Sequence, residues 1–415
     1  MLAYSKFSGM TEGAAHMEPA VAVGTKFMQE VNSAAILAQL RAAGRISVSS
    51  LAQRTGLSRQ AVTRSLTVLE SAGYAEITGP DREANTSGRP PQMVRFCAEA
   101  GYAVGIDVNP HGIRVIVADL AGETVGDTRT VLTRGSGTSI GAAVRDQVAD
   151  TLADMAVTPD KVWHVSVATP GIVDPVTGVV TLIPSMPEAA GNALVSELRE
   201  LVSCPIYLDN DVKLATKGER WRGEPRKEDA LVFIDWGERI GAGIVLHGEL
   251  YRGASNDAGD IGYLDLVVDP AHGTDADSEL GPFERWTGTG ELLAIAAANR
   301  DGEGPVTLTE LNDAAQRGED WALSAVRTVT ARFAKGVAAL RALLDPEVVV
   351  IGGDMAALGS VMLDALEEAL SNGPLRPPRL EISRLGSEAI AQGAIRHSLT
   401  AIERERFESP SVRRE

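Results

Sequence analysis

The stretch DALVFIDWGERIGAGIVLHGELYRGASNDAGDIGY, residues 229–263, is the part of the chain from which the fold is most readily inferred. It begins with an apolar run that ends on Asp235, and a glycine-rich turn then leads into a second apolar run over 243–247. A turn at Gly248 and a short third run follow. Apolar runs separated by glycines, which let the backbone turn and approach a partner closely, predict a meander of three consecutive strands.

An earlier stretch, residues 102–120, repeats this plan. Its sequence, YAVGIDVNPHGIRVIVADL, also gives a strand that ends on an aspartate, Asp107, followed by a turn that contains glycine and by a second strand. A pattern that occurs twice, about 130 residues apart, predicts two similar lobes that face a common cleft.

Composition restricts the class of protein. The chain has 415 residues, of which 44% are hydrophobic, as expected for a globular protein of two or three domains. Its two cysteines, Cys97 and Cys204, lie far apart in the sequence, which excludes a disulfide framework and fits a reducing compartment. The N-terminus lacks the pattern of a signal peptide, and no apolar run is long enough to span a membrane. We therefore expect a cytoplasmic protein without a membrane partner.

Charge is unevenly distributed along the chain. The formal net charge is −17, which taken alone disfavours nucleic acid as a partner. Residues 21–96, however, hold nine Lys and Arg against five Asp and Glu. A basic segment on an acidic body is typical of a nucleic-acid-binding domain joined to a domain with another role. Random variation over a short segment is the alternative.

Residues 32–72 predict a helix-turn-helix. A first helix, expected from near Asn32 to just before Gly44, is followed by a second helix that ends at Gly56. Ser58 then caps a third, longer helix whose apolar residues recur at helical spacing. Two short helices, a glycine-containing turn and a longer helix are the plan of this motif.

The polar face of the third helix, residues 59–72, carries side chains of the kinds that reach base edges and phosphates in a major groove. Two strands follow, 74–77 and 92–96, and the polar loop between them predicts the wing of a winged helix. The alternative is a small three-helix subdomain with an ordinary solvated polar face. The predicted DNA contacts are Ser58, Arg59, Gln60, Thr63 and Arg64 on the helix, with Arg82 and Arg89 on the wing.

From Tyr102 onward, strands alternate with helices, which predicts an α/β body. The expected strands before the opening stretch are 102–108, 112–120, 123–132, 162–168 and 206–208, with helices within 138–156, 192–201 and 211–221. The expected elements after it are helices near 280–298, 307–315, 318–343, 355–371 and 387–403, with strands over 348–351 and 379–384.

These segments resemble the ROK family (repressors, open reading frames and kinases). The resemblance covers about 32–403 and rests on the order and spacing of five segments together. It implies the two-lobed fold of actin-like ATPases and hexokinases (ribonuclease H-like), with a sugar site in the cleft and, as in family repressors, a winged helix in front. The segments are GIDVNPHGIRVIVADLAGE (105–123), ATPGIVDPVTGVV (168–180), LDNDVKLATKGE (208–219), DWGERIGAGIVLHGELYRGASNDAGDIGYLDL (235–266) and DPEVVVIGGDM (345–355).

The resemblance divides the chain into five parts. They are a disordered N-terminus (1–24), a winged helix-turn-helix (25–98), a first lobe (102–226) completed by the C-terminal helix 387–403, a second lobe (227–386) and a flexible tail (404–415).

Both phosphate turns depart from the pattern of family kinases. The first turn of those kinases is rich in glycine, and its backbone N–H groups approach phosphate; here Pro110 has no N–H and the glycine pair is absent. In the second turn, Glu238 would place a carboxylate beside phosphate, and two anions about 4 Å apart repel by roughly 4 kcal/mol at an effective dielectric near 20. Arg239 would offset part of this repulsion. We therefore expect neither ATP binding nor catalysis.

The sugar side of the site is partly retained. Asn210 and Asp211 match the Asn-Asp pair of the family, in which the carboxylate serves as general base in a kinase or as hydrogen-bond acceptor in a sensor. The residues alone equally permit a helix cap, and both can hold. For Glu284, a solvated surface carboxylate is the alternative. The predicted ligand-binding residues are Gly171, Asn210, Asp211, Asp260, Tyr263 and Glu284.

The zinc site of the family has no counterpart in the sequence. No cysteine remains in the corresponding segment, 271–282, and the lone His272 does not make a tetrahedral site. We expect no metal and no other cofactor.

The combined expectation is a DNA-binding transcriptional regulator of carbohydrate-related genes, and repressor is the family expectation. It would bind double-stranded operator DNA as a homodimer or a higher homo-oligomer, and a sugar or sugar derivative in the cleft would shift its conformation. Two alternatives remain: an ATP-dependent sugar kinase with Asp211 as general base, and a body that responds to a protein partner.

Overall fold

The computed structural model describes residues 25–79, 91–132, 139–174, 177–183, 186–223, 228–269, 278–302, 304–371, 373 and 375–408. These form two compact units, one that runs to Phe96 and includes Phe407, and one from Cys97 to Arg406. Some expectations fall outside the described residues: the N-terminus 1–24, the wing contacts Arg82 and Arg89, His272, and the tail from 409.

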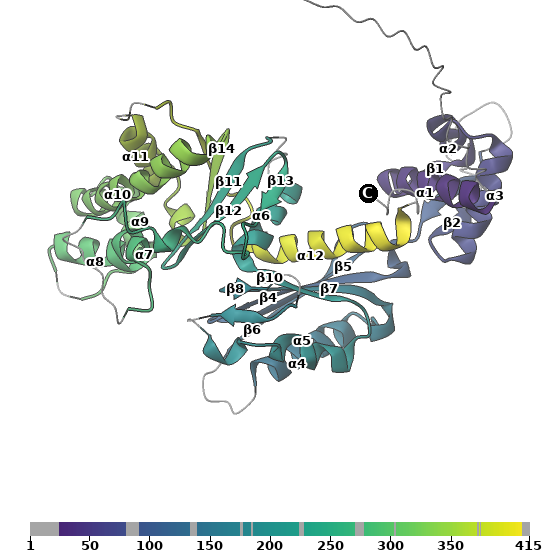
Figure 1. The fold of residues 1–415 in the computed structure, drawn as a ribbon, viewed down its shortest axis with the longest axis horizontal. Helices are drawn as coiled ribbons and strands as arrows, with labels where there is room; N and C mark the ends of the chain where they lie inside the picture. Colours follow the sequence, from purple (N-terminus) through teal and green to yellow (C-terminus); the bar gives the residue numbers. More distant parts are fainter. Residues whose placement is uncertain are drawn as a thin grey trace, which may run out of the picture. The chain divides into compact units, whose positions relative to one another are not determined.

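The first unit is a winged helix-turn-helix with three helices and a small sheet (Figure 1). The helices are α1 (Thr25–Ala43), α2 (Val48–Thr55) and α3 (Arg59–Ser71), and the sheet has the order β1 (Arg45–Ser47), β3 (Met93–Phe96), β2 (Ala75–Thr78). The Ser58 side chain caps α3, and Gly56 ends α2 with a φ of 70°, where glycine carries no steric cost. The predicted motif is confirmed, but α1 begins well before Asn32 and strand β1 was not predicted.

The end of the chain differs from the expected flexible tail. Helix α12 (Ala389–Ile402) continues into a π-helical turn, η8 (Glu403–Phe407). Phe407 is buried in the first unit, where its ring meets Tyr74 edge-on at a centroid distance of 5.4 Å and the Arg41 guanidinium lies 4.9 Å above it. The prediction of a flexible tail is therefore wrong for 404–407, because this aromatic ring anchors it.

The first lobe of the second unit is a five-stranded sheet with helices on both faces (Figure 1). The strand order is β10 (Ile206–Asn210), β7 (Val162–Thr169), β4 (Tyr102–Asn109), β5 (Gly112–Asp119), β6 (Thr124–Val131). Helices α4 (Ile140–Asp154) and α5 (Ala193–Leu201) cover one face, and α12 packs on the other beside α6 (Asp211–Arg222). Helix α12 is the C-terminal helix that was expected to complete this lobe, and that division into lobes stays a prediction.

The second lobe has a sheet of the same kind. Its strand order is β13 (Glu249–Tyr251), β12 (Ile240–Leu246), β11 (Leu231–Trp236), β14 (Val348–Gly352), β15 (Arg379–Ile382). Its helices are α7 (Pro282–Thr287), α8 (Thr289–Asn299), α9 (Leu308–Gln316), α10 (Asp320–Leu344) and α11 (Gly359–Ser371). The predicted two-lobed α/β class is confirmed, since both lobes open with a meander and then continue through parallel strands β7 and β14.

Glycines bring α6 and α12 into close contact. A Cβ on Gly218 would lie 2.2 Å from the Ala389 carbonyl oxygen, and one on Gly393 would lie 1.7 Å from that of Leu214. Only glycine permits so near an approach of two helix backbones. Since α6 also packs against β12, this helix joins the two lobes and begins at their common edge.

Candidate ligand site and nucleic-acid interface

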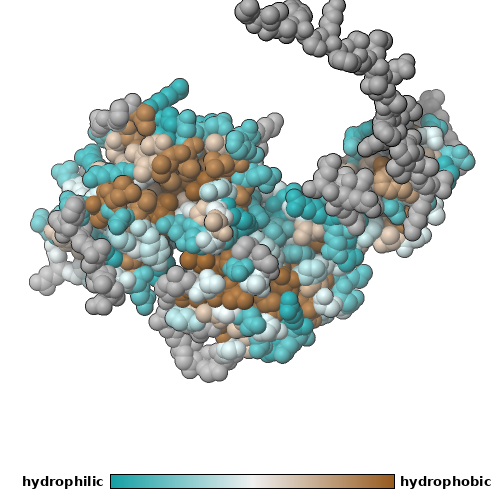
Figure 2. Space-filling model, viewed as in Figure 1, coloured by the Kyte–Doolittle hydropathy of each residue, from teal (hydrophilic) through white to brown (hydrophobic). Residues whose placement is uncertain are grey.

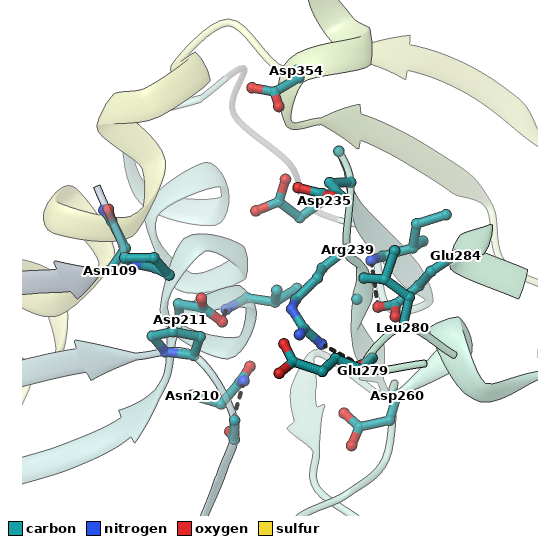
Figure 3. Close-up of a pocket in the computed structure, with 18 of the residues that line it drawn as sticks. Asn109, Asn210, Asp211, Asp235, Arg239, Asp260, Glu279, Leu280, Glu284 and Asp354 are labelled. Atoms are coloured by element: carbon teal, nitrogen blue, oxygen red, sulfur yellow. Dashed lines mark hydrogen bonds between the residues drawn. The ribbon is translucent and has the colours of Figure 1, made fainter. Parts of the chain in front are cut away.

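A cavity of about 680 Å³ lies between the two lobes of the second unit (Figure 3). The first lobe contributes the turn after β4, the residues that follow β7 and the start of α6. The second lobe contributes the end of β11, the turn after it and residues near η4 (Ile261–Tyr263). A ligand in this cavity would contact both lobes at once.

All six predicted ligand residues line this cavity. They are Gly171, Asn210 and Asp211 from the first lobe and Asp260, Tyr263 and Glu284 from the second. The structure thus brings together residues that are spread over more than a hundred positions of the sequence.

Asn210 caps helix α6, which is the structural role that the sequence left open beside ligand binding. Its Oδ1 accepts a hydrogen bond from the Lys213 backbone N–H at 3.2 Å, which caps α6, and its Nδ2 donates to the Gly171 carbonyl oxygen at 3.0 Å. The same side chain lines the cavity. The cap therefore fixes Asn210 at the cavity wall.

Asp211 follows at the first position of α6. Its Oδ1 accepts from the Val212 backbone N–H at 2.7 Å. Burial raises the pKa of the Asp211 carboxyl, and the nearby charge of Asp260 raises it further. Burial also raises the pKa of Asp260, which Lys213 partly opposes. The two lobes thus present facing carboxyl groups with raised pKa values.

Glu284 is not the solvated surface carboxylate considered as the alternative. It is 5% exposed, and its two oxygens accept from the backbone N–H groups of Ile240 at 3.0 Å and Gly281 at 2.7 Å. Both oxygens thus brace the turn after β11 and the start of α7. Tyr263, by contrast, is 51% exposed at the cavity.

The sequence missed two carboxylates that line the cavity, Asp235 and Asp354. Asp235 was recognised only as a strand end that matches Asp107 in the first lobe, and Asp354 not at all. Burial raises the pKa of Asp235 to about 7, assisted by the charges of Asp211, Asp354 and Asp107. Burial and the Asp211 charge likewise raise the pKa of Asp107 to about 7. Matching strand ends in two similar lobes were the signal that could have placed Asp107 and Asp235 together.

Asp235→Asn is expected to stabilise the fold near neutral pH. The folded protein holds a proton on Asp235 that the unfolded chain releases between about pH 4 and pH 7, so this group makes stability fall as pH rises through that range. Removing the charge should raise the free energy of unfolding by about 2 kcal/mol at pH 8, with a smaller gain at pH 5. Chemical denaturation at both pH values measures this, and an equal gain at both would contradict it.

The first turn offers few backbone donors to a phosphate. Pro110 has no N–H, and the backbone N–H groups of His111 and Gly112 donate to Asn109 Oδ1 at 2.9 and 3.1 Å. In the second turn, the Gly237 N–H donates to the Arg239 carbonyl oxygen at 3.1 Å. These three donors are thus used within the chain.

Within the described ranges, no group of three His, Cys, Asp or Glu side chains is arranged to hold a metal ion. Cys97 and Cys204 are not joined in a disulfide.

The DNA-contact residues predicted on the helix form one exposed face of α3. Arg59, Gln60, Thr63 and Arg64 are exposed, while Val62 and Leu66 on the opposite face are buried. Ser58 accepts from the Ala61 backbone N–H at 3.2 Å and so starts the helix. The helix therefore presents an amphipathic arrangement whose polar side is open to a major groove.

Comparison with known proteins assigns both units. The ROK family model matches residues 103–397, and a winged helix-turn-helix DNA-binding model matches residues 33–76. The chain belongs to the ROK family. It carries a winged helix-turn-helix DNA-binding domain in addition to the ROK body.

Relatives of this ROK protein include regulators and kinases. It is 22% identical over 384 residues to the xylose repressor of Caldicellulosiruptor bescii, which covers 89% of this chain and 95% of the repressor. A solved ROK family transcriptional regulator, a homolog of the Escherichia coli MLC protein, matches with a TM-score of 0.70 at 20% identity, over 90% of this chain and 97% of that one. A ROK family glucokinase from Streptomyces griseus, solved with glucose and AMPPNP, matches 72% of this chain and all of its own, with a TM-score of 0.58 and 21% identity. The matches to the regulators extend over the DNA-binding unit, whereas the match to the kinase covers the ROK body.

None of the helices in the described part of this ROK protein is both long enough and apolar enough to cross a membrane.

Proposed function

We propose that this protein is a repressor of carbohydrate-related genes whose DNA affinity is set by a sugar-like effector in the cavity between the ROK lobes. The observation that carries the proposal is the exposed polar face of α3 on the same chain as a cavity built from both lobes. The first feature supplies a reader of the major groove, and the second supplies a place where a ligand can change the angle between lobes.

The backbone N–H groups of the turn after β4 donate within the chain, which supports a regulatory rather than a catalytic role for the body. A kinase aligns free backbone N–H groups with the phosphates of ATP. Here Asn109 Oδ1 occupies two of these donors, and Glu238 is exposed in the second turn. The sugar side keeps Asn210 and Asp211 at the cavity wall.

The effector would act through differential contact with the two lobes. Allostery requires a ligand that prefers one arrangement of the body over another. A homodimer would present two copies of α3 to a two-fold operator, so a change in body shape would alter the spacing of the reading helices. Figure 2 shows apolar side chains gathered on the visible face of the ROK body, which fits a surface that associates with another copy.

Operator binding measured with and without a sugar panel tests the proposal. Genomic fragments retained by the full-length protein would identify the operator, and fluorescence anisotropy would then give its affinity. A panel of hexoses, pentoses and their amino and N-acetyl derivatives is expected to include at least one compound that changes this affinity. No specific operator would disprove regulation, and an operator insensitive to every compound would favour control by a protein partner.

A sugar kinase is the second candidate, because the raised pKa of Asp211 at the cavity wall is what a general base needs. We expect no turnover when the protein is incubated with MgATP and the same sugars, since the His111, Gly112 and Gly237 N–H groups already donate within the chain. ADP release would be followed with a coupled assay. Turnover that disappears in Asp211→Asn but persists in Asp364→Asn, an exposed carboxylate on α11, would overturn the assignment as a regulator.

A further inference from the structure

The cavity is strongly acidic at one end. Asp235, Asp354 and Asp211 lie around the end where the two phosphate turns meet, and Figure 3 places Asp235 and Asp354 on the same side of the cavity. Four further carboxylates line the cavity, namely Glu238, Glu279, Asp260 and Glu284. Among the described lining residues, Arg239 is the single Lys or Arg.

Asp235 lines this end of the cavity with little internal compensation. It ends β11, and the groups that shift its pKa are the desolvating protein around it and three other carboxylates, Asp211, Asp354 and Asp107. No described residue contributes a hydrogen bond or a positive charge that lowers this pKa. An occupant that supplies positive charge and N–H donors would satisfy it.

Asp107 gives a second, independent indication. Its side chain is 6% exposed, and its Oδ1 is buried without a hydrogen-bond partner, while Oδ2 accepts from Asn109 Nδ2 at 3.4 Å. Asp107 lies at the end of β4, close enough to Asp211 for the two charges to interact. A buried carboxylate oxygen without a donor is costly, and Asp107, which the charges of Arg114 and Arg129 compensate in part, adds to the negative charge beside Asp211.

The nearby cationic side chains, Arg239 and Lys213, do not compensate the charge of Asp235. Arg239 donates from Nη1 to the Glu279 carbonyl oxygen at 3.3 Å, which directs its guanidinium away from Asp235 (Figure 3). Lys213 is 2% exposed, and burial lowers the pKa of its ammonium, which acts on Asp260, Asp209 and Asp211. Neither contributes to the environment of Asp235.

The shape of the acidic end favours an organic cation over a metal ion. The described carboxylates do not come together in any group of three that could hold a metal, and the cavity measures about 680 Å³. A primary ammonium group has three N–H donors and can bridge carboxylates that stand further apart. Sugar hydroxyls would use the remaining polar groups, Asn210 and Asp260.

We propose that the effector is a sugar or polyol with a protonated primary amine, and that its ammonium group binds between Asp235 and Asp211 at the acidic end of the cavity. This inference rests on the proposed function and names the chemical class of its effector. Phosphorylated sugars are excluded by the same carboxylates, because an anion there would be repelled by each of them. An amide, which is neutral, would lose the charge attraction while keeping the sugar ring.

Isothermal titration calorimetry on the full-length protein at pH 7 tests this with matched ligands. The probes are D-glucosamine, D-galactosamine and D-mannosamine, each compared with its N-acetyl derivative and its parent hexose, together with D-glucosamine 6-phosphate and MgCl2 alone. At least one free amine is expected to bind about tenfold tighter than its N-acetyl partner and its parent hexose, and the 6-phosphate is expected to bind more weakly than the free amine.

The variant Asp235→Asn identifies the subsite. It should weaken binding of the preferred amine by about tenfold and leave parent hexoses unchanged, whereas the exposed Asp364→Asn on α11 should change neither. Circular dichroism of both variants confirms that they fold.

Each contrary result is informative. An N-acetyl or parent sugar that binds as tightly as the amine, or an amine affinity that Asp235→Asn leaves unchanged, would overturn the inference while the proposed sugar-responsive repressor stands. Binding of MgCl2 without binding of any amine would show that the cation is inorganic and would also overturn it. Absence of any ligand, together with intact operator binding, would reject both this inference and the sugar effector but not the DNA-binding function.

Discussion

Replacing Arg59 and Arg64 together by alanine is expected to lower operator affinity by about a hundredfold or more. Both side chains are exposed on the polar face of α3, at the N-terminal part of the helix that enters a major groove in this class of domain. A bidentate contact from arginine to a base contributes about 1–3 kcal/mol of discrimination, so loss of two such contacts accounts for the effect. Since exposed substitutions change stability little, the domain should fold normally.

The lysine variants separate base reading from phosphate contact. Arg59→Lys with Arg64→Lys keeps both charges but removes the planar fork that pairs with guanine. If the arginines read bases, the lysine protein should bind operator and unrelated DNA with similar affinity while its dependence on salt stays close to that of the wild type. If the arginines contact only phosphate, the lysine protein should retain its preference for the operator.

A charge-matched control comes from the ROK body. Arg199 on α5 and Arg327 on α10 are exposed, and replacing both by alanine changes the net charge by the same amount. Anisotropy titrations at two salt concentrations should show an operator affinity near that of the wild type for this control. If the Arg59 and Arg64 alanine variant behaves like the control, α3 is not the reading helix.

The sequence predicts those parts of the structure that depend on local patterns. The meanders β4–β5 and β11–β12 follow from alternating apolar runs and glycine turns, and the start of α3 follows from the Ser58 cap. Gly171, Asn210 and Asp211 reach the cavity because short motifs after strand ends carry them there. In each case a few neighbouring residues contain the whole signal.

The features that the sequence did not reveal depend on contacts between distant segments. Strand β1 exists because Arg45–Ser47 pairs with β3 far along the chain, and three residues alone carry no strand pattern. Phe407 looks like part of a charged tail until Tyr74 and Arg41 are placed around it. The position of Glu284 likewise depends on two backbone N–H groups that only the folded turn presents. Sequence patterns do not encode such partners.

A buried ion pair between the two ROK lobes is the clearest such case. Arg252, after β13 in the second lobe, donates to both oxygens of Asp209 at the end of β10, at 3.0 and 2.7 Å, and also to the Tyr207 hydroxyl at 2.9 Å. Asn256 extends the contact by donating to the Val173 carbonyl oxygen at 2.7 Å. The segment from 252 to 256 thus ties the second lobe to the first, directly before Asp260 and directly beside Asn210.

Arg252→Ala is expected to destabilise the protein by about 3–5 kcal/mol, because it leaves the fully buried Asp209 carboxylate without its cation. Although burial alone would raise the pKa of Asp209, the hydrogen bonds and charge of Arg252 hold it below its ordinary value. The pair therefore stabilises the fold at neutral pH, and this contribution is lost as pH falls and Asp209 becomes protonated. The difference between variant and wild type should shrink correspondingly in acid, as measured by urea denaturation at pH 7 and at pH 4.

Adding Asp209→Asn to Arg252→Ala decides whether the buried charge is the cause. The double variant should recover part of the lost stability, because its side chain no longer needs a cation. Arg317→Ala, which removes an exposed ion pair with Glu319, should leave the unfolding midpoint nearly unchanged and serves as the control. A double variant less stable than Arg252→Ala would show instead that Asp209 is held mainly by Tyr207 and Asn256, and that Arg252 contributes through packing between the lobes rather than through its charge.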